Sequence, residues 1–151
     1  FLLMNTLQNK WYIQIYFKED LIDIMINNIF EKQSIGIGFN IDIDMKNSTK
    51  NGIDLYINNY KEFTQKQKKY VLDTFDIFIN QMKIGDIVYL CKGHSDILYK
   101  AIISSDYYFD STGGSNGTEI YKFWHHRRNI VNIEPCNLKK NLPNNSILHT
   151  T

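Results

Sequence analysis

The densest group of chemically active side chains is His125-His126-Arg127-Arg128, which contains both arginines of the chain. Guanidinium groups bind phosphate through paired hydrogen bonds, so this cluster, together with Lys122, could hold phosphate groups. A solvated strand end is the alternative interpretation of the same residues. The adjacent histidines would project from opposite faces of a strand, so we do not expect them to share a metal ion.

No arrangement in the sequence predicts catalysis. His94-Ser95-Asp96 has the residue types of a hydrolytic triad, but three consecutive residues cannot form its geometry. Asp42 and Asp44 resemble the start of a calcium loop, although the glycine and the final glutamate of that loop are missing. We therefore expect a non-enzymatic domain with no cofactor and no metal ion.

Composition narrows the class of protein. The 151 residues fit one domain, and 17 basic against 16 acidic side chains argue against binding polyanions by charge alone. Residues 111–151 are more basic, with five cationic and two anionic side chains, an excess of 5 − 2 = +3. No apolar run of about 18 residues occurs, so we expect no membrane span and a cytoplasmic location. Two cysteines are too few for a disulfide scaffold.

The hydrophobic pattern predicts alternating strands and helices. Residues 35–44 alternate apolar and polar, and Thr64 with Gln67 forms a possible capping box. The predicted strands are residues 11–17, 35–44, 87–91, 98–109 and 127–134. The predicted helices are residues 20–30, residues 53–60 and a third helix that begins after Thr64. One face of this third helix carries Val71, Leu72, Phe75, Phe78, Ile79 and Met82.

This order predicts an α+β fold, in which a small curved β-barrel is flanked by helices. Residues 1–10 would form an N-terminal extension and residues 11–135 the domain. We expect Pro135 to end the last strand, and residues 136–151 to be a linker or tail that leads to a further domain.

Three segments together resemble a known family. They are residues 34–40 (SIGIGFN), residues 82–90 (MKIGDIVYL) followed by 101–110 (AIISSDYYFD), and residues 124–133 (WHHRRNIVNI). Their order is similar to the EVE/YTH branch of the PUA-like superfamily, and most similar to the N-terminal DNA-reading domains of McrB-type, modification-dependent restriction GTPases. The resemblance covers residues 11–135 and implies a pocket, lined by aromatic side chains, that accepts a base flipped out of nucleic acid.

The resemblance implies where this aromatic cage lies. An aromatic side chain comes from the segment with Phe39 and Asn40, a second is Trp124, and Tyr16, Phe17 and Lys18 border the pocket. The family usually has Trp where this chain has Phe39. Phe39 could equally pack in the core, because it lies on the apolar face of an alternating segment. Trp11 is a further cage candidate, although a tryptophan that begins a strand is more often buried.

In such a cage, the free energy gained by stacking a base roughly offsets the cost of removing it from the duplex. Extruding a base costs a few kcal/mol, and stacking returns about 1–3 kcal/mol per base. The amide of Asn40 could hydrogen-bond the edge of adenine or cytosine. Lys18, Lys122 and residues 125–128 would contact the nucleic-acid backbone beside the cage.

We therefore expect a DNA-binding specificity domain that reads a methylated base, with N6-methyladenine favoured and a modified cytosine open. The resemblance implies an AAA-type GTPase motor and a nuclease as partners, with the GTPase beyond Thr151, because no phosphate-binding glycine loop occurs in the chain. The alternatives are an RNA reader of the same fold and a module that binds a protein or a small ligand.

Overall fold

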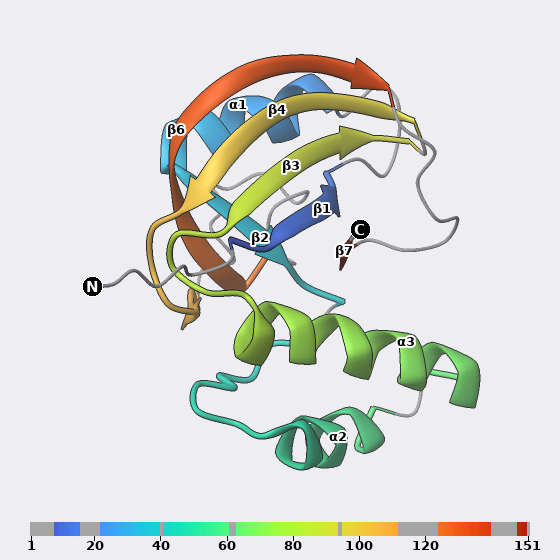
Figure 1. Ribbon diagram of the computed structural model, residues 1–151. Coiled ribbons are helices and arrows are strands. Elements are labelled where there is room, and N and C mark those ends of the chain that lie inside the picture. The colour runs from blue at the N-terminus through green and yellow to red at the C-terminus, as the bar shows by residue number, and fades with distance from the viewer. Residues whose placement is uncertain are drawn as a thin grey trace.

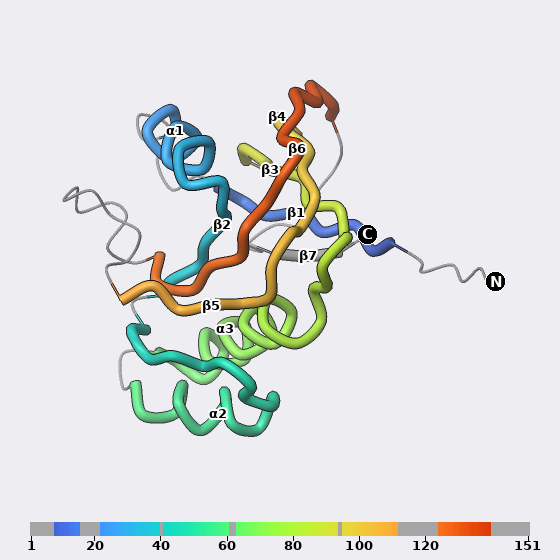
Figure 2. The backbone as a smooth tube through the Cα atoms, turned by 90° about the vertical axis from the view of Figure 1, so that its left-hand side faces the viewer, coloured from blue at the N-terminus to red at the C-terminus, as the bar shows by residue number. Residues whose placement is uncertain are grey.

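The computed structural model describes residues 8–15, 22–39, 41–60, 63–93, 95–111, 124–139 and 148–150. A strongly curved sheet is packed against helices on one side and at one end (Figures 1 and 2). The elements are β1 (Lys10–Gln14), α1 (Ile22–Lys32), β2 (Ser34–Ile37), α2 (Lys50–Asn58), α3 (Gln65–Asp76), the π-helical turn η2 (Ile77–Gln81), β3 (Ile87–Lys92), β4 (Asp96–Ile103), β5 (Tyr108–Phe109), β6 (His126–Lys139) and β7 (Leu148–Thr150).

The sheet has the strand order β2-β6-β4-β3-β1-β7, and β5 pairs with the start of β6. Neighbouring strands are antiparallel except β1 and β3, which are parallel. Two helices, α2 and α3, form a layer beyond one end of the sheet (Figure 1), whereas α1 contacts β4 through the rings of Phe30 and Tyr99. The predicted α+β class, with a small curved β-barrel flanked by helices, is confirmed, and the barrel is a curled half-barrel.

One core joins the sheet to the helices. Met25 and Ile29 of α1 are fully buried, as expected from their spacing on one helical face. The capping box that opens α3 is present, with Thr64 and Gln67 bonding each other's backbone N–H groups. From the predicted apolar face of this helix, Val71, Phe75, Phe78 and Met82 are buried and Leu72 and Ile79 are half-buried.

The predicted strand over residues 35–44 is too long, because β2 ends at Ile37. Phe39 has a left-handed backbone (φ 52°), and the Ile41 amide turns back to donate to the Gly38 carbonyl at 3.0 Å. Ile41 is nevertheless fully buried. The apolar positions are therefore buried or half-buried as expected, but Gly36 and Gly38 between them are buried as well, and the turn at Phe39 removes the chain from the sheet.

The last long strand was predicted to end before Pro135, yet β6 continues to Lys139. Proline lacks a backbone donor and is tolerated at a sheet edge. Among the described residues, β6 beyond Asn129 pairs only with β4, so the other side of Pro135 needs no ladder bond. The part of the expected linker over residues 136–139, and residues 148–150 in β7, thus lie in the sheet.

The predicted strand over residues 98–109 is divided into two strands, β4 and β5.

A buried carboxylate joins β1 to β3. Asp86 accepts hydrogen bonds from the Trp11 indole N–H at 2.8 Å, the Lys83 amide at 2.9 Å and the Asn9 amide at 3.3 Å. Gly85, with a φ of 96° that favours glycine, makes the turn just before it. Glycine before aspartate favours a turn at this position, and this turn is also a polar anchor. None of the helices described here is long and apolar enough to cross a membrane.

We expect Trp11→Phe to destabilise the fold by about 2–4 kcal/mol, because Asp86 loses a buried donor and the smaller ring leaves part of the indole's space in the core unfilled. Urea unfolding followed by circular dichroism measures this loss. Tyr89→Phe is the matched control, since it also removes one polar group from a β3 aromatic ring beside β1 and should change stability by less than about 0.5 kcal/mol. Equal losses in the two variants would contradict the anchoring role of the Trp11–Asp86 bond.

Candidate ligand pocket

The predicted cationic cluster lies inside the protein. Its first residue, His125, is half-buried, and the side chains of His126, Arg127 and Arg128 are at most 2% exposed. Both ring nitrogens of His126 bond protein partners and Arg127 donates to protein acceptors, so the prediction that these two residues contact a nucleic-acid backbone is wrong. The alternative of a solvated strand end is wrong for all three residues, and Arg128 uses three of its five N–H groups on protein carbonyls. β6 begins with these residues and pairs there with both β2 and β5.

Arg128 caps the end of the long helix formed by α3 and η2. Its guanidinium donates to the carbonyls of Phe78 at 2.6 Å, Ile79 at 3.1 Å and Ser105 at 3.0 Å. The last carbonyls of a helix lack intrahelical donors, and a cation is favourable at that end of the helix dipole. Burial lowers the pKa of Arg128, yet a guanidinium keeps its proton in proteins.

Arg127 holds the start of β6 to β2 and to Trp124. Its Nε donates to the Trp124 carbonyl at 3.0 Å, and its Nη1 donates to the Ser34 hydroxyl at 2.9 Å. The guanidinium also lies 5.4 Å from the centre of the Trp124 ring, within cation–π range. Both side chains are thereby fixed in the interior.

Trp124 is a core residue and does not line an open cage. It is 4% exposed, and its side chain packs on Gly36, where an added Cβ would come within 3.1 Å. A glycine inside a strand allows another group to approach closely, and this is found at Gly36 of β2. The group that approaches is Trp124 itself, so the expectation of a base beside this tryptophan is not met in this arrangement.

His126 is a neutral, buried histidine with both ring nitrogens engaged. Nε2 lies 2.6 Å from the Ile41 carbonyl, which can only accept, so Nε2 carries the proton. Nδ1 then accepts from the Tyr107 hydroxyl at 2.7 Å, and that hydroxyl accepts from the Met45 amide at 3.0 Å. Burial lowers the pKa of His126 to about 4. His125, by contrast, stacks on Phe109 and donates through Nδ1 to the Asp110 carbonyl at 2.9 Å.

The other predicted cage residues are dispersed. Phe39 is half-buried and packs against the rings of Tyr70 and Phe75, at centroid distances of 5.7 Å and 5.8 Å. Trp11 is 4% exposed and belongs to the core, where its N–H is used by Asp86. The remaining predicted contact residues, Tyr16, Phe17, Lys18, Asn40 and Lys122, lie outside the residues that the structure describes.

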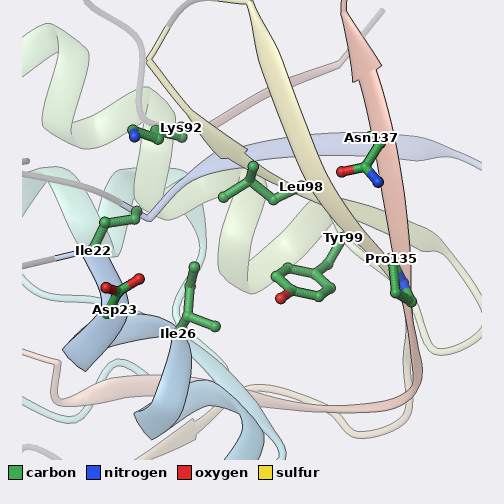
Figure 3. A pocket seen from close by; sticks show the side chains of 8 residues that line it. All are labelled: Ile22, Asp23, Ile26, Lys92, Leu98, Tyr99, Pro135 and Asn137. Atoms are coloured by element: carbon green, nitrogen blue, oxygen red, sulfur yellow. The ribbon is translucent and has the colours of Figure 1, made fainter.

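A different set of residues surrounds an open pocket of about 430 Å³, which lies between α1, the first half of β4 and the second half of β6 (Figure 3). This volume falls in the range of small-molecule sites. The pocket is lined by Ile22, Asp23 and Ile26 of α1, Lys92 of β3, Leu98 and Tyr99 of β4, and Pro135 and Asn137 of β6. Its walls thus come from four elements of the fold.

The lining combines one aromatic ring with polar groups on two sides. Tyr99 is half-buried and held by an edge-to-face contact with Phe30, at a centroid distance of 5.1 Å. Figure 3 shows Asp23 on the α1 side of the space and Asn137 on the β6 side. Asn137 has a left-handed backbone (φ 41°), a conformation that asparagine tolerates better than most residues. The pocket can therefore accept a flat, partly apolar ring with donors and acceptors on its edge.

Sequence reasoning did not single out Tyr99, Asp23 or Asn137. Tyr99 meets Pro135 only through the antiparallel register of β4 and β6, across 36 positions of chain (135 − 99). Because β6 continues through Pro135, Asn137 lies at the same end of the sheet as Tyr99. The sequence predicted that the strand ends before Pro135, so this neighbourhood was missed. Within the described ranges, no group of three His, Cys, Asp or Glu side chains could hold a metal ion.

We expect stability to fall as the pH falls from about 6.5 towards 4, because the unfolded chain protonates His126 in this window and the folded chain does not. Between pH 7 and pH 5 the loss from His126 amounts to about 2 kcal/mol. His126→Gln preserves a donor and an acceptor but does not titrate. Urea unfolding at both pH values should therefore give a smaller loss for the variant, and identical losses would contradict the neutral buried state. The other histidines are present in both proteins, so their effects cancel.

Comparison with known proteins assigns the chain to a family. A search of curated proteins returned no match. A family model described as a domain of unknown function, DUF8426, matches residues 14–150. The match extends from the end of β1 to β7 and includes every residue that lines the pocket. Because this match covers most of its length, the chain belongs to the DUF8426 family.

Proposed function

We propose that this chain is a non-catalytic DNA-binding domain that recognises a methylated base, with N6-methyladenine favoured, after flipping it out of the duplex. The observation that carries the proposal is the pocket between α1, β4 and β6, with the Tyr99 ring in its wall. The place of the domain in a restriction system, with a GTPase and a nuclease as partners, rests on the resemblance of the sequence alone.

The fold supports the same proposal. The segments that carry the resemblance come together, since Gly36 of the first pairs with Arg127 of the third. The second segment forms the turn at Gly85, β3, and the end of β4 with β5. The small curved sheet with flanking helices agrees with the architecture that the resemblance implies.

The pocket offers the interactions that an extruded base needs. Stacking on the Tyr99 ring would return about 1–3 kcal/mol of the few kcal/mol that extrusion costs. The Asp23 carboxylate can accept from an exocyclic amine, and the Asn137 amide can both donate and accept. Burying a methyl group against Ile26 or Leu98 adds about 0.8 kcal/mol, so the polar groups and the pocket shape must supply most of the selectivity.

The proposal places the base at Tyr99, away from the predicted cage residues Phe39, Trp124 and Trp11. Those side chains have protein neighbours around them, whereas Tyr99, Asp23 and Asn137 border open space. Lys92, at the β3 end of the lining, is a cation that could approach a phosphate next to the base.

We expect the protein to bind a duplex with one N6-methyladenine more tightly than the matched unmethylated duplex at the same salt concentration. Tyr99→Ala should weaken binding to the methylated duplex by about tenfold, because a stacking surface is lost. Asp23→Asn, an exposed change at the same pocket, should reduce the preference between the two duplexes, with a loss of stability of at most about 1 kcal/mol because Asp23 lies in the first turn of α1. Fluorescence anisotropy titrations measure all of these affinities.

Phe39→Leu is the matched control for Tyr99→Ala, since it removes an aromatic ring from the predicted cage and leaves the pocket intact. Its affinity for methylated DNA should equal that of the unaltered protein. Equal binding of the two duplexes by the unaltered protein would overturn base reading. A preference lost in Phe39→Leu and kept in Tyr99→Ala would return the base to the predicted cage, and preferential binding of single-stranded RNA through its 2′-hydroxyls would select the RNA alternative.

A further inference from the structure

A second cavity, of about 260 Å³, lies where four segments meet at the buried end of β6. It is lined by Lys46 and Asn47 from the loop before α2, Ile79 and Asn80 of η2, Asp106 and Tyr107 between β4 and β5, and Arg128 of β6. Arg128 and Pro135 are seven positions apart on an extended strand, so this cavity is distinct from the pocket beside Tyr99.

Arg128 brings unused donor capacity to this cavity. A guanidinium has five N–H groups, and Arg128 uses three of them on the carbonyls of Phe78, Ile79 and Ser105. In the part of the chain that the structure describes, one N–H on each terminal nitrogen has no acceptor. No ion pair between described residues involves Arg128 either, so three carbonyls are its direct partners, while Asp106 and Asp86 act on its charge from a greater distance.

The remaining polar groups favour an anion. The exposed Lys46 adds a second cation, and Asn47 adds an amide donor. The Asn80 amide nitrogen already donates to Asp76 at 2.9 Å, so it has one further N–H for a ligand. Asp106 is the single carboxylate among the lining residues, so two cations face one anion. The Tyr107 hydroxyl is already committed to His126 and to the Met45 amide.

The walls of the cavity are fixed before any ligand binds. The Met45 amide is tied to Tyr107, and the Ser48 amide closes a turn onto the Met45 carbonyl at 3.0 Å. This turn holds Asn47 in a left-handed conformation, with a φ of 63°. On the other side, Arg128 fixes the end of η2 through two carbonyls. A preorganised set of donors loses less entropy when it binds a ligand.

We propose that this cavity binds a phosphate-type oxyanion, with Arg128 as the central donor and Lys46 and the two amides completing the site. Each terminal nitrogen of the guanidinium keeps one N–H, and a guanidinium can bind phosphate oxygens through both of its terminal nitrogens. The negative charge of Asp106 repels a bound anion. Removing this charge should therefore strengthen anion binding, whereas removing the charge of Lys46 should weaken it. This site does not depend on base reading, and each of the two can fail without the other.

The test is a titration of the full chain with inorganic phosphate at constant ionic strength, followed by calorimetry and by NMR of the Asn47 and Asn80 side-chain amides. We expect saturable binding with shifts at both amides. Lys46→Ala should weaken binding by about fivefold, and Asp106→Asn should strengthen it by about fivefold, because each changes one exposed charge beside the anion. Arg128→Lys should abolish binding, and the two exposed variants keep the test decisive if that protein does not fold.

Lys66→Ala and Asp54→Asn are matched controls, since they change the same charges on α3 and α2 and do not line the cavity. Absence of saturable binding would overturn the proposal. So would equal effects of Lys46→Ala and Lys66→Ala, or of Asp106→Asn and Asp54→Asn.

Two sources of the oxyanion are separated by a competition arm. A dinucleotide without terminal phosphate, which contains only a phosphodiester, should displace inorganic phosphate if the site holds a nucleic-acid backbone. Displacement by a mononucleotide and not by this dinucleotide would identify a free phosphate monoester as the ligand. Either result supports an oxyanion site.

Discussion

Three consecutive polar side chains are buried at the start of β6, and the fold is organised around satisfying them. His126 bonds the Ile41 carbonyl and Tyr107, Arg127 bonds Ser34, and Arg128 bonds the end of η2 and the Ser105 carbonyl. These partners lie up to 93 positions away along the chain. A buried polar group without a partner costs about 1–3 kcal/mol, more when charged, so these contacts fix where β2, the following loop and the helix end lie.

This constraint divides β6 into two parts with different roles. The first part is enclosed by β2 and β5 and is used as an anchor. Beyond Asn129 the strand pairs on one side only among the described residues, and most of its side chains from Val131 to Lys139 are exposed. The pocket beside Tyr99 lies at this second part, and the cavity beside Arg128 lies at the first. One strand thus holds the interior together and presents residues to both candidate sites.

The regular elements were largely predictable, whereas the site was not. The face of α3 and its capping box follow from local spacing, because a helix places residues three and four apart on one side. Hydropathy predicted that residues 126–128 are exposed to solvent, and this prediction was wrong. Two arginines and a histidine can be buried only with hydrogen-bond partners, and these partners are distant in the sequence. The mixed lining of the pocket, with Asp23, Tyr99 and Asn137, has no local pattern at all, because three elements contribute one polar or aromatic side chain each.

The sequence by itself determined the α+β class, the apolar faces of the helices, the Gly-Asp turn before β3 and the close approach at Gly36 of β2. Each of these depends on neighbouring residues, whose periodicity or backbone freedom is written in the chain. Only the tertiary structure decided that Trp124 fills the space above Gly36, that β6 passes through Pro135 and that Arg128 caps a helix 49–50 positions before it. Those outcomes depend on strand register and on which buried donor finds which acceptor, and both are set by packing between segments far apart in sequence.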